Sequence, residues 1–437
     1  MVDIVATTLV IGVLFAVLAL QISRFLPQLR SLVWLAFLER LICAVAQIFF
    51  GADSRVYAAG GAALSSYMDR SFGTAAPEVL AMLFQRPSRF DALIASPESN
   101  TGSMVGASAC LTFLVRSADY AVPFLVTGLA FFGSLAIFKS FQDAVPSANP
   151  RRLFAWTVLF PSIAFWTSAL IKETFCLIGI GCVCAAWRYS RSGRWLLAAP
   201  FATVGIAIVL LFRAGALPPL AVGLGAYFAF ERIGRVRGAN AALVGPLYLA
   251  VAIGGVAVCV ALTSRIAPSL APSNISETVA RQHSIWTGTT GGSNLSETEN
   301  LPQSPGALAL RLPLGLINAL FRPQLFDVNN ALVLVSALEM TYITFVLLGI
   351  VRRRGIRVFG DLRRSPFLLM CSIVVAIGCS FVGVVTLNLG SLARYRVPFL
   401  PFYGALLAIL SEKLASLPVA EPAEASPRIS LVPSNPR

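Results

Sequence analysis

Charged residues are scarce in this chain of 437 residues, of which 12% are Asp, Glu, Lys or Arg and 57% are hydrophobic. A soluble globular protein has about a quarter of its residues charged, so the composition argues against that class. Apolar runs of about 20 residues, the length that crosses a bilayer core, recur along most of the sequence. Because a lipid-facing backbone must satisfy its own hydrogen bonds, we predict an all-α, polytopic helical membrane protein.

Histidine and acidic residues are also few. The chain has one His, and 20 acidic residues stand against 34 basic ones, giving a net charge of +14. A single His makes a His-based metal site improbable, and the eight Cys lie mostly in apolar runs, where Cys behaves as a small hydrophobic residue. No nucleotide-binding glycine loop is present, so we predict no cofactor and leave a divalent metal open. The basic excess lies mostly between apolar runs and is read as an orientation signal, with no nucleic-acid partner.

The apolar runs predict eleven transmembrane spans, with the lipid bilayer as the first partner. They lie at about 4–23, 31–50, 120–138, 153–170, 174–187, 195–212, 214–230, 242–262, 330–350, 366–387 and 397–410. The first run has no basic region before it and no small-residue cleavage site, so it is predicted to be a retained helix. The short spans on either side of Lys172 are alternatively one broken element.

Arginine-rich connections orient these spans. When they are placed in the cytoplasm, every second connection lies inside, the N-terminus lies outside and the C-terminus lies inside. We therefore predict one membrane domain over residues 1–410, two long outer segments at about 51–119 and 264–329, and a disordered cytoplasmic tail over 411–437 that is rich in Pro, Glu, Ala and Ser.

The first outer segment contains two moderately apolar pieces, 79–84 and 104–115, that are predicted to be helices along the membrane interface. An alternative makes 104–115 a span, but it would move Lys139, Arg151 and Arg152 to the outer side, against the charge rule.

Three polar residues follow the second span directly: Asp53, Arg55 and Tyr57. A carboxylate at the bilayer surface could act as a general base on a sugar hydroxyl or hold a cation against a lipid phosphate. Alternatively, Asp53 caps the helix that begins the outer segment.

Lys172 and Glu173 lie between two apolar runs, and Glu339 lies nine residues into another. Charges in such places are expensive unless they pair, protonate or face a wet cavity, so all three are candidate functional residues. The alternative for Lys172 and Glu173 is a hairpin turn whose charges reach the headgroups by snorkelling.

Arginine is unexpectedly frequent on the predicted outer side. Arg213 lies between two spans, and Arg394 and Arg396 follow Asn388 before the last span. A lipid-linked diphosphate would suit these residues, since the guanidinium group makes two parallel hydrogen bonds to phosphate oxygens. Ordinary phospholipid headgroups would also suit Arg213.

The second outer segment supplies the remaining candidates. Trp286 offers a ring on which a sugar can stack, close to Arg281 and His283 and before a Gly-rich stretch, and Arg322 lies near the end of the segment. A flexible surface loop explains the glycines equally well.

The order of these motifs resembles a known group of proteins. The chain has an outer Asp after an early span, then a Phe-Pro-Ser…Phe-Trp…Ser…Lys-Glu hairpin, and finally Asn-x-Gly…Arg-x-Arg-x-Pro…Pro. In this order the chain resembles bacterial exopolysaccharide-cluster proteins, namely repeat-unit polymerases and polyprenyl-phosphate-sugar-dependent C-fold glycosyltransferases. The resemblance covers about 49–409. It implies that Asp53 is the catalytic base and that Arg213, Arg394, Arg396 and Arg322 hold lipid diphosphates. The outer loop follows the second span here, not the first.

We therefore expect an inner-membrane enzyme that transfers a sugar or oligosaccharide from a polyprenyl-linked donor at the outer face, possible partners being other polysaccharide-assembly proteins. Catalytic roles are assigned to Asp53, Lys172 and Glu173. Two rival hypotheses are a flippase for the same lipid-linked sugars, which would also use buried charges, and a non-catalytic scaffold of the assembly machinery.

Overall fold

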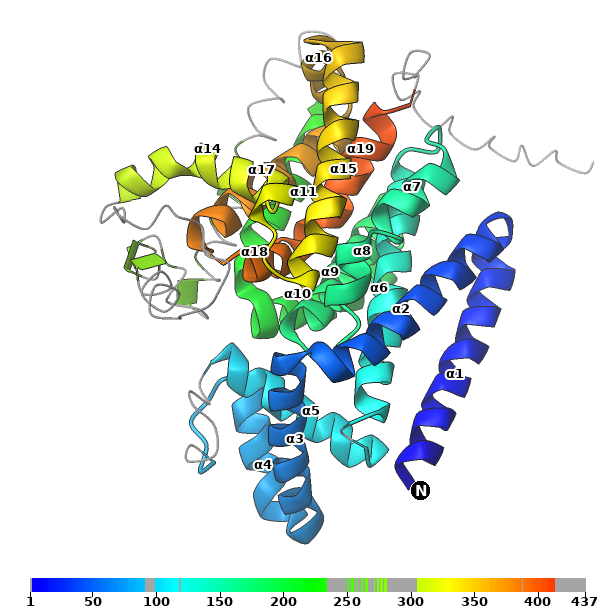
Figure 1. Cartoon of the computed structure of the whole chain (residues 1–437), viewed down its shortest axis with the longest axis vertical. Helices are drawn as coiled ribbons and strands as arrows, with labels where there is room; N and C mark the ends of the chain where they lie inside the picture. Colours follow the sequence, from blue (N-terminus) through cyan, green and yellow to red (C-terminus); the bar gives the residue numbers. More distant parts are fainter. Residues whose placement is uncertain are drawn as a thin grey trace, which may run out of the picture.

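The computed structural model describes residues 2–90, 99–117, 119–233, 305–386 and 388–412, with scattered positions between 250 and 280. Every regular element in those five ranges is a helix (Figure 1). The prediction of an all-α protein is therefore confirmed for the described part of the chain. Most of the predicted span at 242–262 and nearly all of the predicted tail lie outside the described residues.

Among the residues that the structure describes, six helical segments are long and apolar enough to cross a bilayer, by length and composition. They are Asp3–Phe25, Pro27–Phe50, Ala121–Ala144, Trp195–Arg232, Val333–Arg354 and Pro366–Val385. The protein is thus a multi-pass membrane protein. The predicted eleven spans also include helices that are shorter or more interrupted than these six segments. The number of eleven therefore stays a prediction.

Helices α1 (Val2–Phe25) and α2 (Arg30–Phe50) form a hairpin at one edge of the molecule (Figure 1). Most of α1 faces outward, as expected for a helix that lies against lipid. The inner face of α2 packs on α6 (Ala121–Ala144), where the Phe37 and Phe131 rings lie 5.3 Å apart between centroids.

Glycines let the central helices approach each other closely. A Cβ atom on Gly181 of α9 (Lys172–Arg191) would lie 2.6 Å from the Cα of Gly133 in α6. Helix α14 (Pro305–Phe321) contacts α17 (Pro366–Val385) in the same way at Gly315 and Gly383. Such contacts between small residues are the usual means by which membrane helices pack, because lipid offers no hydrophobic drive for helices to associate.

The first long segment between spans forms a lobe of three helices at the lower end of Figure 1. These are α3 (Ala52–Arg70), α4 (Phe72–Leu83) and α5 (Asn100–Val115). The predicted helices at 79–84 and 104–115 are confirmed as helical, and α3 is an additional one. Leu64, Val79 and Met104 belong to a second apolar core, which also contains Val126 and Phe212 and so joins the lobe to the bundle.

The predicted spans at 153–170 and 397–410 are not single helices. The first is divided into α7 (Pro150–Thr157) and α8 (Pro161–Trp166), followed by irregular chain up to α9. The second consists of a short 3₁₀ turn and α19 (Leu400–Leu410), preceded by α18 (Leu389–Tyr395). Proline explains both breaks, since Pro161 and Pro398 cannot donate a main-chain hydrogen bond.

The remaining helices complete the bundle. Helix α10 (Trp195–Arg213) ends in a 3₁₀ turn before α11 (Leu217–Ile233), so Arg213 lies at a helix end, as predicted. Helix α15 (Ala331–Arg354) leads into α16 (Arg357–Arg364), which lies at the opposite end of the molecule from the lobe (Figure 1).

Candidate functional site

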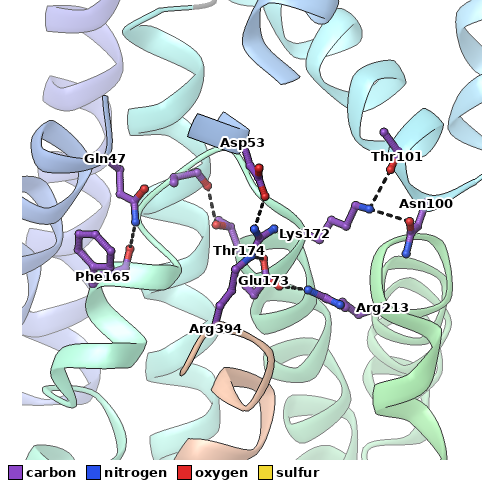
Figure 2. Close-up of polar contacts among 11 residues, drawn as sticks. Gln47, Asp53, Asn100, Thr101, Phe165, Lys172, Glu173, Thr174, Arg213 and Arg394 are labelled. Carbon is purple, nitrogen blue, oxygen red and sulfur yellow. Dashed lines mark hydrogen bonds and ion pairs between the residues drawn. The ribbon is translucent and has the colours of Figure 1, made fainter. Parts of the chain in front are cut away.

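Five charged side chains gather where the three-helix lobe meets the bundle, and Figure 2 shows them together. They are Asp53 in the first turn of α3, Lys172 and Glu173 at the start of α9, Arg213 at the end of α10, and Arg394 on α18. We call this group the charge cluster. All five are among the residues predicted from the sequence.

Glu173 is the centre of the charge cluster, and its side chain has no exposed surface. One carboxylate oxygen, Oε2, accepts a hydrogen bond from Nε of Arg394 at 2.7 Å, and Oε1 forms an ion pair with Arg213. A buried carboxylate is tolerated only when it is paired in this way. The two arginines therefore stabilise a negative charge that would otherwise be excluded from the interior.

Arg394 connects this buried acid to the surface. While its Nε contacts Glu173, its terminal nitrogen forms an ion pair with Asp53. The side chain of Arg394 is 12% exposed, whereas that of Asp53 is 52% exposed. Asp53 is thus the accessible end of a series of ion pairs that begins at Glu173 in the protein interior.

Arg213 keeps an unused hydrogen-bond donor. Its guanidinium carbon lies 4.1 Å from the centroid of the Tyr395 ring, a cation–π contact that orients the group. The buried Nε atom of Arg213 has no hydrogen-bond partner within the described part of the chain. The Nε atoms of Arg40 and Arg396 are also unpaired there, but those residues are fully buried, whereas the side chain of Arg213 is 23% exposed. Arg213 is therefore the candidate contact for an anionic ligand.

Lys172 is held by neutral groups. Its Nζ atom donates to Oδ1 of Asn100 at 2.7 Å and to Oγ1 of Thr101 at 3.0 Å (Figure 2). The same atom lies 6.0 Å from the centroid of the Tyr57 ring. With Lys172, the cluster contains three cations and two carboxylates, an excess of one positive charge. Tyr57 is buried on α3, and this burial raises the pKa of its phenol.

Side-chain hydrogen bonds hold the end of α8 and the irregular chain that follows it against α2 and α3. The Gln47 amide donates to the Phe165 carbonyl at 3.1 Å, and the Ser54 hydroxyl accepts from the Leu170 amide at 3.2 Å. Polar backbone at membrane depth must be satisfied within the protein, so these bonds are what permits the break. The break in turn brings Lys172 and Glu173 to the lobe.

Arg396 does not join the charge cluster, although it lies two residues from Arg394. It is fully buried and donates to the Ala319 carbonyl at 3.0 Å, the Arg322 carbonyl at 2.5 Å and the Ser336 hydroxyl at 3.3 Å. These bonds tie α18 to α14 and α15. Its donors point into the protein, so we leave Arg396 out of the proposed ligand contacts.

The other predicted residues are spread over the structure. Arg322 lies 3.8 Å from Asp327, and the carboxylate of Glu339 accepts hydrogen bonds from the amide and hydroxyl of Ser162. Asn388 accepts from the Ser391 amide at 3.0 Å and caps α18, while Arg55 is exposed on α3. Three more predictions, Arg281, His283 and Trp286, lie outside the described residues.

Sequence reasoning did not single out Arg40, a fully buried residue in the middle of α2. Its guanidinium donates to the Ser134 hydroxyl at 2.8 Å and to the Thr167 hydroxyl, so it links α2 to α6 and to the broken segment. A signal was present, because Glu39 and Arg40 are adjacent charges within a predicted span. Asn100, Thr101 and Tyr395 gave no comparable signal.

No group of three or more His, Cys, Asp or Glu side chains within the described ranges is arranged to hold a metal ion. Comparison of the chain with family models, with curated proteins and with solved structures finds no match. The function is therefore argued from the charge cluster itself.

Proposed function

We propose that this protein transfers a sugar or oligosaccharide from a polyprenyl-phosphate- or polyprenyl-diphosphate-linked donor at the outer face of a bacterial inner membrane, in cell-surface polysaccharide assembly. The observation that supports this most is the chain of contacts from buried Glu173 through Arg394 to half-exposed Asp53. An accessible carboxylate therefore lies beside an excess of positive charge where the lobe meets the bundle.

The chemistry divides between the acid and the cations. Asp53 takes the proton of the acceptor hydroxyl while that oxygen attacks the anomeric carbon, and the bond from this carbon to the phosphate oxygen breaks. Arg213 and Lys172 stabilise the negative charge that develops on the departing phosphate. The transfer inverts the anomeric carbon and needs mainly positioning in addition to these groups.

The charge pattern supports the outer face. Orientation by the Arg-rich connections puts the end of α2, the start of α9 and the end of α10 on the same, outer side. The ion pair between Glu173 and Arg213 requires the start of α9 and the end of α10 to lie at the same depth in the membrane, and Arg394 pairs with Glu173 at that depth. This requirement agrees with the orientation.

Analysis of lipid-linked glycans tests the proposal. Cells that lack the protein are complemented with the intact chain, with Asp53→Asn or Arg213→Gln, or with the control Asp69→Asn, which changes an exposed acid on the same helix that pairs with Arg116. At matched protein abundance, we expect the first two variants to accumulate outward-facing lipid-linked sugars and the control to behave as the intact chain. Accumulation at the inner face would favour a flippase, and normal glycans with Asp53→Asn would contradict the proposed chemistry.

A further inference from the structure

A pocket of about 280 Å³ opens between α7, α15 and the end of α19, and none of its lining residues belongs to the charge cluster. Its walls include Arg152 and Trp156 from α7 and Tyr342, Phe345, Ile350 and Arg353 from α15. The pocket thus combines two arginines with three aromatic rings.

The two kinds of side chain are separated along the pocket. Arg152 precedes Trp156 by one helical turn, and Arg353 follows Tyr342 by eleven residues, which is about 16 Å along a helix. Trp156 and Tyr342 stack with their centroids 5.8 Å apart and an angle of 8° between the rings. The pocket therefore has cations at one end and an aromatic wall at the other.

The two arginines of the pocket have no acidic partner among the described residues. Within the described residues, neither Arg152 nor Arg353 forms an ion pair with an acid, whereas the neighbouring Arg354 pairs with Asp361 at 2.6 Å. Position 349 is a glycine, and a Cβ atom there would meet the Arg353 guanidinium at 3.6 Å. The Arg353 side chain thus folds back along α15 over the pocket.

The aromatic end is open to lipid. Tyr342 is 62% exposed and Phe345 is 69% exposed, and both belong to a candidate membrane span. Exposed aromatic and aliphatic groups of a span meet acyl chains, so this end of the pocket suits a hydrocarbon chain. The arginines lie at the end of the span that the charge pattern places in the cytoplasm, where the leaflet contains anionic lipids.

From this arrangement we infer a binding site for an anionic phospholipid of the cytoplasmic leaflet. Arg152 and Arg353 hold its phosphate, and an acyl chain lies along Tyr342 and Phe345 beside the stacked Trp156. The site is independent of the proposed transfer reaction, since it shares no residue with the charge cluster. Phosphate is the group recognised, and a bilayer lipid is distinguished from a soluble phosphate by the need for the apolar wall.

Native mass spectrometry of the full-length protein tests this site. The protein, held in phosphatidylcholine nanodiscs, is titrated with phosphatidylglycerol, and retention of the added lipid is measured. We expect Arg152→Gln and Arg353→Gln each to weaken retention about fivefold, and both together about 25-fold. The control is Arg151→Gln with Arg352→Gln, which removes two exposed arginines one residue away and should leave retention unchanged.

The outcomes separate the alternatives. Equal weakening by the control pair would overturn the site, because general attraction to a basic surface would then explain binding. Displacement of phosphatidylglycerol by inorganic phosphate alone would also overturn it, in favour of a soluble anion. Trp156→Ala should weaken lipid retention without affecting inorganic phosphate. Thermal unfolding is measured for each variant to check that its fold is intact. An arginine variant that unfolds is replaced by Arg→Lys, which keeps the positive charge and should restore most of the lipid retention.

Discussion

Arg394 contacts Glu173 from 221 positions further along the chain, with its Nε atom 2.7 Å from Oε2, and pairs with Asp53 through a terminal nitrogen. One guanidinium group therefore joins an acid with no exposed surface to an acid that is half exposed. Removing Glu173 and removing Asp53 should have different consequences, because burial determines how much of the lost charge interaction water can replace.

Glu173→Gln should destabilise the protein strongly. The substitution leaves Arg213 and Arg394 facing each other without the carboxylate that pairs with both. Removing one partner of a buried ion pair costs about 3–5 kcal/mol, so we expect a clearly lower melting temperature in detergent. The control is Glu78→Gln, which removes an acid 3.5 Å from the exposed Arg89 and should change stability much less, because water and salt screen an ion pair near the surface. A similar melting temperature for both variants would contradict the central role of Glu173.

Asp53→Asn should separate activity from stability. Asp53 pairs with Arg394 but is half exposed, so its ion pair contributes about 1 kcal/mol or less. We expect near-normal thermal unfolding together with loss of glycan transfer, measured on the same purified protein and in complemented cells. Unfolding at a much lower temperature would mean that Asp53 is structural.

Arg40→Ala should loosen the contact between α2 and the broken segment. Arg40 donates to Ser134 and Thr167, and hydrogen bonds to a charged group contribute about 1.5–3 kcal/mol each. Thermal unfolding should therefore shift down, whereas Arg30→Ala, which changes an exposed residue at the start of the same helix, should leave it nearly unchanged. Equal stability of the two variants would show that the buried arginine is dispensable.

Gly383→Ala should separate α14 from α17. A Cβ atom on Gly383 would overlap the main chain of Gly315, and forcing extra atoms into a packed contact costs about 1–3 kcal/mol. The matched control is Gly360→Ala in α16, where a Cβ atom meets nothing within 4 Å and the better helix propensity should raise stability slightly. Melting temperatures that move in opposite directions would confirm the prediction, and a neutral Gly383→Ala would contradict it.

Cysteine labelling checks the predicted orientation. In a variant without its native cysteines, Ser66→Cys on α3 should react with a membrane-impermeant maleimide in intact spheroplasts. Ser192→Cys, in the connection between α9 and α10, should react only after the membrane is opened. Both serines are exposed, so access from one side should decide the result. Reversed labelling would place the charge cluster on the cytoplasmic side.

Much of the charge cluster could be predicted from the cost of charge near lipid. Glu173 and Arg213 attract attention because each interrupts apolar sequence, and Asp53 because it follows a span directly. Their partners could not be predicted, since ion pairs between helices depend on how the helices pack. Arg394 and Arg396 show this best: two residues apart, they looked like one basic site, yet one enters the charge cluster and the other binds main-chain carbonyls.

The sequence by itself determined that this is a helical membrane protein, because a long apolar run without charge has only one way to satisfy its backbone in lipid. Pro161 and Pro398 lack the donor that a helix requires, yet the segments around them were predicted as single spans, so the breaks became clear only in the structure. Only the tertiary structure decided which charges meet and which side chains line the pocket beside α15. Such contacts depend on distances of a few ångströms between segments far apart in the chain, and hydrophobic periodicity contains no information about those distances.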